Sequence, residues 1–430
     1  MKRLAANPLR GMRGQALAAV LLKAFGIAAA MLLQWLVART YGATGQGLFG
    51  LMATTVALTA VIGIFGQDYL ALRNIAGDLA EGNQEQARAH AQASIRITLV
   101  GSALATLAVA VTAVIYYEVL DSASTALILI AALPAVAALA IGRLFAFVAR
   151  AGGNIFKSQL VDGPITSGLG ALLIAALWLL PERPPVWTLG IAYSLSYLAA
   201  LALGLAIGLR ALAAWPRPAE PAPSRPLLVS GVSRVVGYAS PFLSDWSVIF
   251  SMTALWGAAA AGLVRVPTQF LNAMFLIALA LDAVFAPKMA AALRLGDRVT
   301  LKRLYRNYVL GSLAMNVPVV LVLTLAPEQV LGLFGPEFVE AAPALRLGAL
   351  AMALTVAMGP AGLVLVMSHN ERLTYISNGV GLIVLALGCW WAIPQYGVTG
   401  GILTMAAVQL GKRIMELVLV TRALRMRVLA

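Results

Sequence analysis

The sequence has 430 residues, of which 61% are hydrophobic and only 11% charged, and its formal net charge is +14 at pH 7. A soluble domain is roughly 45–50% apolar and about 25% charged. A chain of this composition therefore cannot hide its apolar residues in a water-facing fold and requires the bilayer as part of its solvent. The single cysteine, Cys389, excludes an intramolecular disulfide.

The first 13 residues are basic, and the apolar run after them is long enough to cross a bilayer without ending in a clear cleavage site. We interpret it as a transmembrane helix and not as a signal peptide. Because a spanning helix needs about 20 mostly apolar residues, the chain is predicted to be an all-α integral membrane protein with about twelve spans. In chain order the predicted spans are 15–38, 47–67, 95–117, 124–148, 156–180, 187–210, 236–256, 260–286, 307–326, 342–367, 373–393 and 397–423.

The second half of the chain resembles the first at a shift of 215 positions. Residues 41–48 read YGATGQGL and residues 256–263 read WGAAAAGL, and each is followed by a long apolar run and then a basic helical stretch. The shift aligns Gly42 with Gly257, Gly47 with Gly262, Leu48 with Leu263, Arg73 with Lys288 and Arg88 with Arg303. Six spans per half give both halves the same orientation, so the sequence predicts two parallel repeats.

The basic residues are distributed as membrane topology requires. With a cytoplasmic N-terminus, 24 of the 31 Lys and Arg residues fall in cytoplasmic segments or helix ends, and only Arg39, Arg183 and Arg346 fall outside. Such an excess marks the cytoplasmic side of membrane proteins. We therefore predict that both termini are cytoplasmic and that the positive charge does not indicate a nucleic-acid partner.

A Pro-rich stretch divides the chain. Residues 211–233 contain five prolines, which favour extended backbone, and are predicted to link an N-terminal lobe (1–210) to a C-terminal lobe (234–430). Two other cytoplasmic stretches, 70–94 and 288–306, are predicted to be amphipathic helices on the membrane surface. The basic residues of the second would be attracted to anionic headgroups.

The sequence contains no G-x-x-x-x-G-K-[ST] and no H-E-x-x-H motif, and its two histidines, His90 and His369, exclude a His-rich metal site. The predicted external loops are short, whereas membrane enzymes that act on lipid-linked sugars usually need a sizeable loop for the acceptor. The sequence therefore favours translocation over bond chemistry, with no catalytic residue, cofactor or metal.

Charged residues inside predicted spans are the best pointers to a site, because they are costly in a bilayer and usually face a bundle interior or a cavity. The five candidates are Lys23, Asp162, Asp245, Arg265 and Asp282. Each could line a cavity or join a structural ion pair, such as Lys23 with Asp245. Asp162 and Asp282 lie near the inner interface, where extension to the headgroups is a further interpretation.

Polar residues elsewhere in the spans add to these candidates. Lys412, Arg413 and Glu416 share the last span, where Lys412 and Glu416 could pair on one helix face. Gln34, Gln269 and Asn272 could line a cavity for a sugar-bearing ligand, or could join helices by hydrogen bonds.

Three stretches resemble one family of transporters. VARTYGATGQGLFG (37–50), LFGPEFVEAAPALR (333–346) and IPQYGVTGG (393–401) are similar, in order, to segments of bacterial polysaccharide flippases of the Wzx type. These flippases belong to the multidrug/oligosaccharidyl-lipid/polysaccharide exporter superfamily. The resemblance covers essentially the whole chain, but its motifs are loose patterns of glycine and apolar residues.

The resemblance implies two six-helix lobes around a central cavity with alternating access, in a bacterial inner membrane. It implies an O-antigen or exopolysaccharide repeat unit on a polyprenyl-diphosphate carrier as cargo, with a polysaccharide polymerase, glycosyltransferases and membrane lipids as partners. Lys23 and Arg265, with Lys412 and Arg413 behind them, then become candidates to contact the diphosphate. Asp245 departs from an all-cationic cavity and, with Asp162 and Asp282, suggests coupling to protons or sodium.

Other functions stay open at this point. The acidic residues Asp162, Asp245 and Asp282 would suit an ion-coupled exporter of organic cations from the same superfamily. A membrane scaffold for polysaccharide assembly, which transports nothing, is a different class. An enzyme that transfers lipid-linked sugars is the least favoured interpretation.

Overall fold

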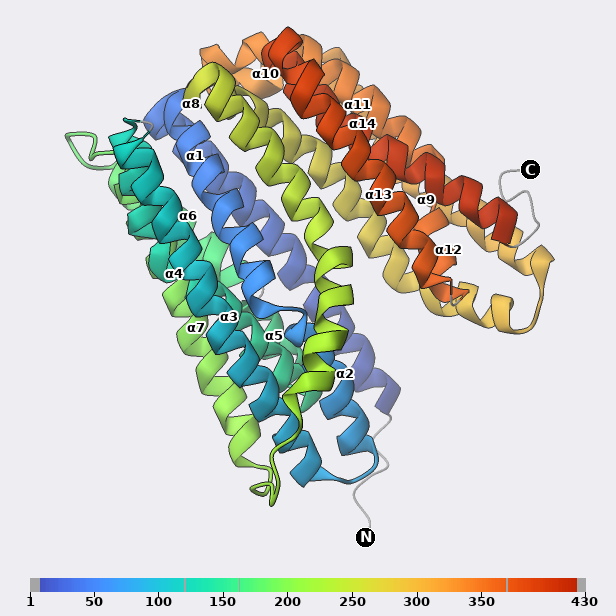
Figure 1. Cartoon of the computed structure of the whole chain (residues 1–430). Helices are drawn as coiled ribbons and strands as arrows, with labels where there is room; N and C mark the ends of the chain where they lie inside the picture. The colour runs from blue at the N-terminus through green and yellow to red at the C-terminus, as the bar shows by residue number, and fades with distance from the viewer. Residues whose placement is uncertain (1–7, 120, 162, 369, 424–430) are drawn as a thin grey trace. The chain divides into compact units, whose positions relative to one another are not determined.

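The computed structural model of the chain describes residues 8–119, 121–161, 163–368 and 370–423, and it contains only helices and short connections within those ranges (Figure 1). In chain order the first helices are α1 (Pro8–Ile64), α2 (Gln67–Ala80), α3 (Gln84–Glu118), α4 (Ala123–Ala151), α5 (Ile155–Val161), α6 (Pro164–Trp178) and α7 (Thr188–Ala213). They are followed by α8 (Ser224–Arg294), α9 (Arg298–Leu325), α10 (Pro327–Gly332), the 3₁₀ turn η1 (Pro336–Ala341), α11 (Ala342–Ala357), α12 (Ala361–Met367), α13 (Glu371–Leu387), the π-helical turn η2 (Gly388–Ala392) and α14 (Ile393–Ala423).

Nine helical stretches among the described residues are long and apolar enough to cross a bilayer. Three of them contain a glycine whose backbone leaves the helical region: Gly42 (φ 66°), Gly257 (φ 84°) and Gly397 (φ 51°). Figure 1 shows α1 and α8 as two arms joined at a sharp turn. Counting the arms of the three kinked stretches separately gives twelve passes, which confirms the predicted all-α multi-pass architecture.

Two predicted spans are each divided into two helices. The span predicted at 156–180 consists of α5 and α6, and the span predicted at 342–367 consists of α11 and α12. In both cases a left-handed glycine precedes a proline: Gly163 (φ 120°) before Pro164, and Gly359 (φ 77°) before Pro360. Proline cannot donate a backbone hydrogen bond, so the helix ends before it and begins again.

The stretches 70–94 and 288–306, each predicted as one amphipathic helix, are instead helical hairpins, so the prediction of a continuous helix is wrong at both places. In the first, α2 ends at Ala80 and α3 begins at Gln84; in the second, α8 ends at Arg294 and α9 begins at Arg298. Each turn contains a left-handed glycine, Gly82 (φ 79°) or Gly296 (φ 66°). The next residue caps the following helix: the side chains of Asn83 and Asp297 accept from the amides of Gln86 and Thr300.

The helices pack into two compact units. Unit 1 contains the residues up to 40 and residues 52–239; unit 2 contains residues 41–51 and residues from 240 onward. The non-helical part of the Pro-rich stretch, residues 214–223, is shorter than the predicted linker and lies on unit 1. There Arg88 Nη1 donates to the carbonyl oxygen of Trp215 at 2.6 Å, and Ala222 is buried with Ala89 and Ala93.

Inside unit 2, the segment 41–51 crosses the second arm of α8, and the contacts are reciprocal under the repeat. A Cβ added to Gly47 would lie 1.7 Å from the carbonyl oxygen of Ala258, and one added to Gly262 would lie 2.0 Å from that of Ala43. Ala43 and Ala258 are themselves related by the 215-residue shift. Only glycine permits two helix backbones to approach this closely.

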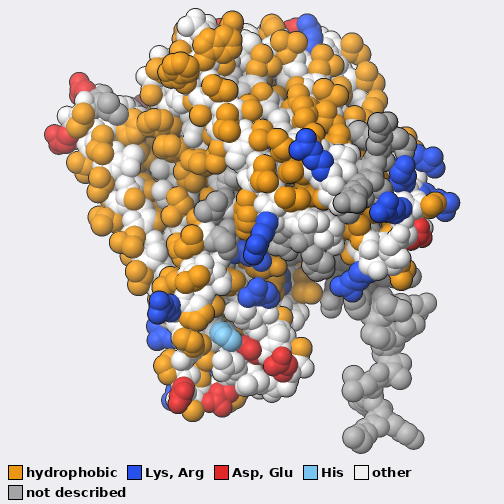
Figure 2. All heavy atoms as spheres, turned by 45° about the vertical axis from the view of Figure 1, so that its right-hand side comes forward, with side chains coloured by type: hydrophobic (Ala, Val, Ile, Leu, Met, Phe, Trp, Pro, Cys, Tyr) orange, Lys and Arg blue, Asp and Glu red, His pale blue; other side chains and the backbone are white. Residues whose placement is uncertain are grey.

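Large apolar side chains cover much of the surface. Leu179, Leu325 and Trp390 are among those that are at least three-quarters exposed, and Figure 2 shows apolar side chains over most of the face in view. An aqueous surface rarely carries so large an apolar area. This surface is the one expected to face lipid in a multi-pass membrane protein.

Candidate functional site

The candidate site lies in unit 2, on the two arms of α8 on either side of Gly257. Asp245 is on the first arm and Arg265 on the second, and the turn brings them together: Asp245 Oδ2 lies 3.8 Å from Arg265 Nη1. The Arg265 side chain is 10% exposed and the Asp245 side chain 30% exposed. A buried guanidinium in an apolar helix bundle is costly unless it has partners, and Asp245 is the acidic partner of Arg265.

Gln269 orients the Arg265 guanidinium. It lies four residues after Arg265, on the same face of the helix. With the amide oxygen turned toward the guanidinium, Gln269 accepts from Nη2 at 2.9 Å and from Nε at 3.1 Å. Gly50 makes room for the Arg265 side chain, because a Cβ at that position would lie 3.3 Å from Arg265 Cγ. The guanidinium is thus held in one orientation before any ligand is present.

A shallow crevice lies beside this pair, lined by Asp245, Arg265, Thr268 and apolar side chains. Sites for drug-sized ligands are about 300–1,000 Å³. The crevice encloses no space of that size, so by itself it does not accommodate an organic ligand.

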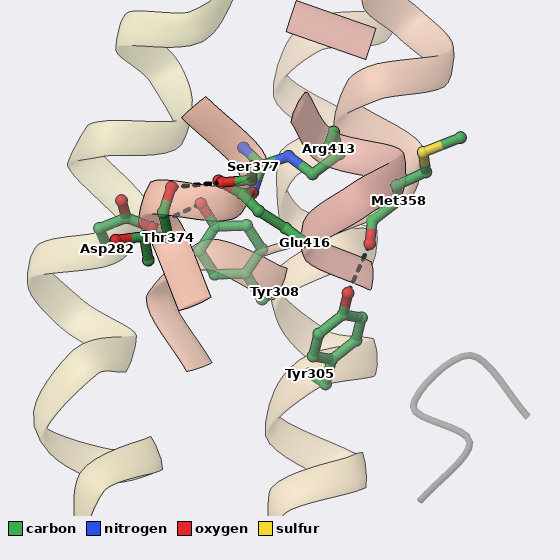
Figure 3. Close-up of polar contacts among 8 residues, drawn as sticks. All are labelled: Asp282, Tyr305, Tyr308, Met358, Thr374, Ser377, Arg413 and Glu416. Atoms are coloured by element: carbon green, nitrogen blue, oxygen red, sulfur yellow. Dashed lines mark hydrogen bonds and ion pairs between the residues drawn. The ribbon is translucent and has the colours of Figure 1, made fainter. Parts of the chain in front are cut away.

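A second polar cluster lies in unit 2 among α8, α9, α13 and α14, with Met358 just after α11 (Figure 3). The Tyr308 hydroxyl donates to Asp282 Oδ1 at 2.7 Å, and the Tyr305 hydroxyl donates to the carbonyl oxygen of Met358 at 2.5 Å. Arg413 Nη1 lies 3.0 Å from Glu416 Oε2. Asp282 is therefore held by a hydrogen bond inside the protein, which disfavours the interpretation that it extends to the headgroups.

The ion pairs differ from the predicted ones. Glu416 pairs with Arg413, three residues away, and not with Lys412, four residues away. The stem of Lys412 instead packs against Gly381 of α13, where a Cβ would lie 2.7 Å from Lys412 Cγ. Asp245 pairs with Arg265, and the side chain of Lys23 lies outside the described residues.

The other predicted site residues are more scattered. Gln34 is buried in α1 within unit 1, and Asn272 is half-buried on the second arm of α8 in unit 2. Asp162 lies outside the described residues. The structure therefore brings Asp245, Arg265 and Gln269 together in one cluster. Asp282, Arg413 and Glu416 belong to a second cluster.

Two further charged contacts were not predicted from the sequence. In unit 1, buried Asp68 pairs with Arg143 at 3.0 Å. In unit 2, Glu337 Oε1 accepts from the amide of Ala43, directly after the Gly42 kink, at 2.7 Å. The sequence does contain a sign that Asp68 matters. It lies 214 positions before the candidate Asp282, so the two residues occupy nearly equivalent positions in the repeat. The second joins residues 294 positions apart, and no local pattern indicates it.

Comparison with known proteins identifies the fold. No protein-family profile and no curated protein sequence matches the chain. Solved structures do match. An inward-facing multidrug resistance transporter of the MATE family, in the MOP superfamily, aligns with 95% of this chain and 98% of its own at 14% identity and a TM-score of 0.68.

Two further solved structures extend this likeness. The lipid II flippase MurJ, in an inward closed conformation, matches 95% of this chain and 87% of its own at 12% identity and a TM-score of 0.70. A MOP-superfamily transporter from Pyrococcus furiosus matches 96% and 94% at 14% identity and a TM-score of 0.63. The chain is a multi-pass membrane protein, and its fold is the one shared by the transporters of the MOP superfamily.

Proposed function

We propose that this protein is a flippase that moves a polyprenyl-diphosphate-linked oligosaccharide across the bacterial inner membrane by alternating access, without changing a covalent bond. The observation that carries the proposal is Arg265, a buried guanidinium oriented by Gln269. Guanidinium groups bind phosphate oxygens with two parallel hydrogen bonds, and intramembrane cations are rarely kept without a ligand or a partner. The solved structures of similar fold include a lipid II flippase.

Asp245 fits this function as the counter-ion of Arg265. A lone buried guanidinium would leave an uncompensated charge in the bundle. A pair separated by 3.8 Å is longer than a charge-assisted hydrogen bond of about 2.7–2.9 Å, so its carboxylate can be displaced by a diphosphate at modest cost. Coupling of this step to protons or sodium through Asp245, with Asp282 and Asp162 as further candidates, is part of the proposal.

The test is flipping of a fluorescent polyprenyl-diphosphate oligosaccharide in proteoliposomes. Arg265→Gln is expected to slow flipping at least tenfold. Arg265→Lys keeps the charge but loses the two parallel N–H donors of the guanidinium, and it is expected to slow flipping less. Because Arg265→Gln leaves Asp245 unpaired, the double variant Arg265→Gln/Asp245→Asn provides a neutral pair that preserves the fold. Arg346→Gln, at an exposed ion pair with Glu328, is the matched control. Flipping by the double variant at the wild-type rate would exclude this role for Arg265.

A second candidate is an ion-coupled exporter of organic cations, as the name of the MATE-family structure describes multidrug resistance for that protein. Asp245 favours it, because a half-buried carboxylate beside an apolar crevice suits a cationic ligand. Export of a fluorescent organic cation would then be lost in Asp245→Asn and kept in Arg265→Lys. If both variants change only stability, the remaining candidate is a scaffold that assembles a polysaccharide polymerase and glycosyltransferases.

A further inference from the structure

The hairpin between α8 and α9 differs in charge from its repeat counterpart in unit 1. We call residues 288–306 the α8–α9 tip; its turn is yellow-orange in Figure 1. Residues 284–310 contain six basic residues and one acidic residue, the helix cap Asp297. The counterpart, 214 positions earlier at 70–96, contains three Arg and three acidic residues. The two hairpins have the same turn and cap, so the difference in charge is not required by the fold.

The exposed apolar residues differ in the same way. Leu295 and Val299 flank the turn and are 83% and 71% exposed. The counterparts of these two positions in unit 1 are Glu81 and Glu85. The α8–α9 tip therefore has aliphatic side chains at the positions where unit 1 has carboxylates.

Basic side chains surround these aliphatic ones. Lys288, Arg294, Arg298, Arg303 and Arg306 are all exposed. Figure 2 shows a group of Lys and Arg side chains at the right-hand edge of its view, beside the apolar surface. Aliphatic side chains with a basic border are typical of segments that lie in the interface between headgroups and acyl chains.

The unit 1 hairpin is used differently. Arg88 donates to the carbonyl oxygen of Trp215, and Glu85 accepts from the amide of Ala219, so that hairpin binds the Pro-rich segment of its own chain. At the 214-residue shift that aligns the two turns, the counterpart of Arg88 is the half-buried Lys302, and the next residue, Arg303, is exposed. The opposite face of the α8–α9 tip is already packed, since Met289, Leu301 and Tyr305 are buried against Ala361 and Val420.

We propose that the α8–α9 tip is a binding surface for anionic phospholipid headgroups, with Leu295 and Val299 inserted at the boundary with the acyl chains. Two membrane-spanning arms end at this hairpin, so headgroups are the nearest partner available to it. A soluble acidic protein or a nucleic acid would match the charge of the α8–α9 tip. Neither would explain the two exposed aliphatic residues at the centre of the tip. The proposal is independent of the transported substrate.

The first test is native mass spectrometry of the full chain in detergent, titrated with phosphatidylglycerol or with phosphatidylcholine of the same acyl chains. A basic residue near an anionic surface contributes about fivefold in affinity. Arg294→Gln/Arg298→Gln/Arg303→Gln is therefore expected to weaken phosphatidylglycerol binding more than tenfold and to leave phosphatidylcholine binding unchanged. The control Arg210→Gln/Arg217→Gln/Arg225→Gln removes three Arg residues of unit 1 and should change binding less than twofold.

The second test measures insertion. Leu295→Trp is reconstituted in phosphatidylglycerol vesicles that contain lipids brominated near the headgroup, and Glu81→Trp is its repeat-matched control. The fluorescence added by the new indole should be quenched at least twofold more in Leu295→Trp. Equal quenching, or equal loss of phosphatidylglycerol binding in the two triple variants, would overturn the proposal. Binding by the tip variant as tight as wild type would do the same.

Discussion

In unit 1, the buried carboxylate of Asp68 pairs with Arg143 at 3.0 Å. This pair lies next to the bend between α1 and α2, where Phe65 and Gly66 have positive φ. In unit 2, its counterpart Asp282 lies within the continuous helix α8 and accepts from Tyr308. The position that corresponds to Arg143 falls at residues 357–358, where there is no cation. The fold thus repeats a carboxylate at this position, buried in unit 1 and half-buried in unit 2, whereas its partner is supplied locally by each unit.

The two kinks are also supported by different groups. After Gly42, the amide of Ala43 is bound by the carboxylate of Glu337. Before Gly257, the Trp256 indole donates to the carbonyl oxygen of Ile393 at 3.0 Å. Glu337 thus satisfies a backbone amide freed at the Gly42 kink, whereas the Trp256 bond joins the residue before the Gly257 kink to α14, so the two kinks are held by different contacts.

The largest expected effect tests whether Gly47 and Gly262 make equivalent contacts where the two helices cross. Gly47→Val and Gly262→Val should each lower the free energy of unfolding by at least about 3 kcal/mol, because the added side chain overlaps backbone atoms of the other helix. Thermal unfolding in detergent micelles would measure this. Gly77→Ala, where a Cβ meets nothing within 4 Å, is the control and should be neutral or slightly stabilising. A strong effect from only one of the two glycines would contradict the reciprocal crossing.

The next effect compares the paired carboxylates. Asp68→Asn leaves the half-buried Arg143 without its counter-charge and should cost about 3 kcal/mol. Asp282→Asn keeps an acceptor for the Tyr308 hydroxyl and should cost less than about 1 kcal/mol. Denaturant unfolding of both variants measures the difference, and equal costs would show that the partners are energetically equivalent.

A smaller effect is expected at the kinks. Glu337→Gln replaces a charge-assisted hydrogen bond to Ala43 by a neutral one at an exposed position, and should cost about 1 kcal/mol. Trp256→Phe removes one neutral hydrogen bond to Ile393 and should cost a similar amount or less. Melting temperatures of the two variants, measured side by side at low and high salt, should show salt dependence for Glu337 only. Salt dependence in both would show that the kinks are not held by different chemistry.

The smallest effect concerns the two caps and depends on pH. Hydrogen bonds from the Thr300 side chain and backbone hold the pKa of Asp297 below its usual range. Its contribution to stability is therefore present above its unfolded-state pKa of about 4 and is lost as the pH falls through the lower folded-state value. The stability difference between wild type and Asp297→Asn should shrink on acidification. Asn83→Ala, in unit 1, should cost about 0.5–1 kcal/mol with no such pH dependence, and a matching dependence there would point to another titrating group.

The main features of the fold were predictable because they depend on local sequence. Apolar length locates the twelve passes, and the glycines shared at 42 and 257 indicate the repeat. The breaks at Gly163 and Gly359 were missed because apolar length cannot distinguish one long helix from two short ones. The hairpin turns were missed because basic amphipathic stretches look alike whether they form one helix or two.

The candidate site was only partly predictable. The cost of intramembrane charge singled out Asp245 and Arg265 separately, but their pairing depends on the turn at Gly257, which brings residues 20 positions apart together. The role of Gln269 follows from its spacing of one helical turn once Arg265 is known to be buried. Glu337 could not have been assigned, since its contact with Ala43 depends on long-range packing that no spacing records.

The crossing at Gly47 and Gly262 has the form of an isologous interface, in which residue i of one surface touches residue j of the other and j touches i. Such a surface is complementary to itself. A chain of half this length, with only one repeat, could form the same contact with a second molecule. The fraction of chains that associated would then depend on their concentration. Joining both copies in one polypeptide makes the association intramolecular, and afterwards each copy is free to change its charges without altering the other.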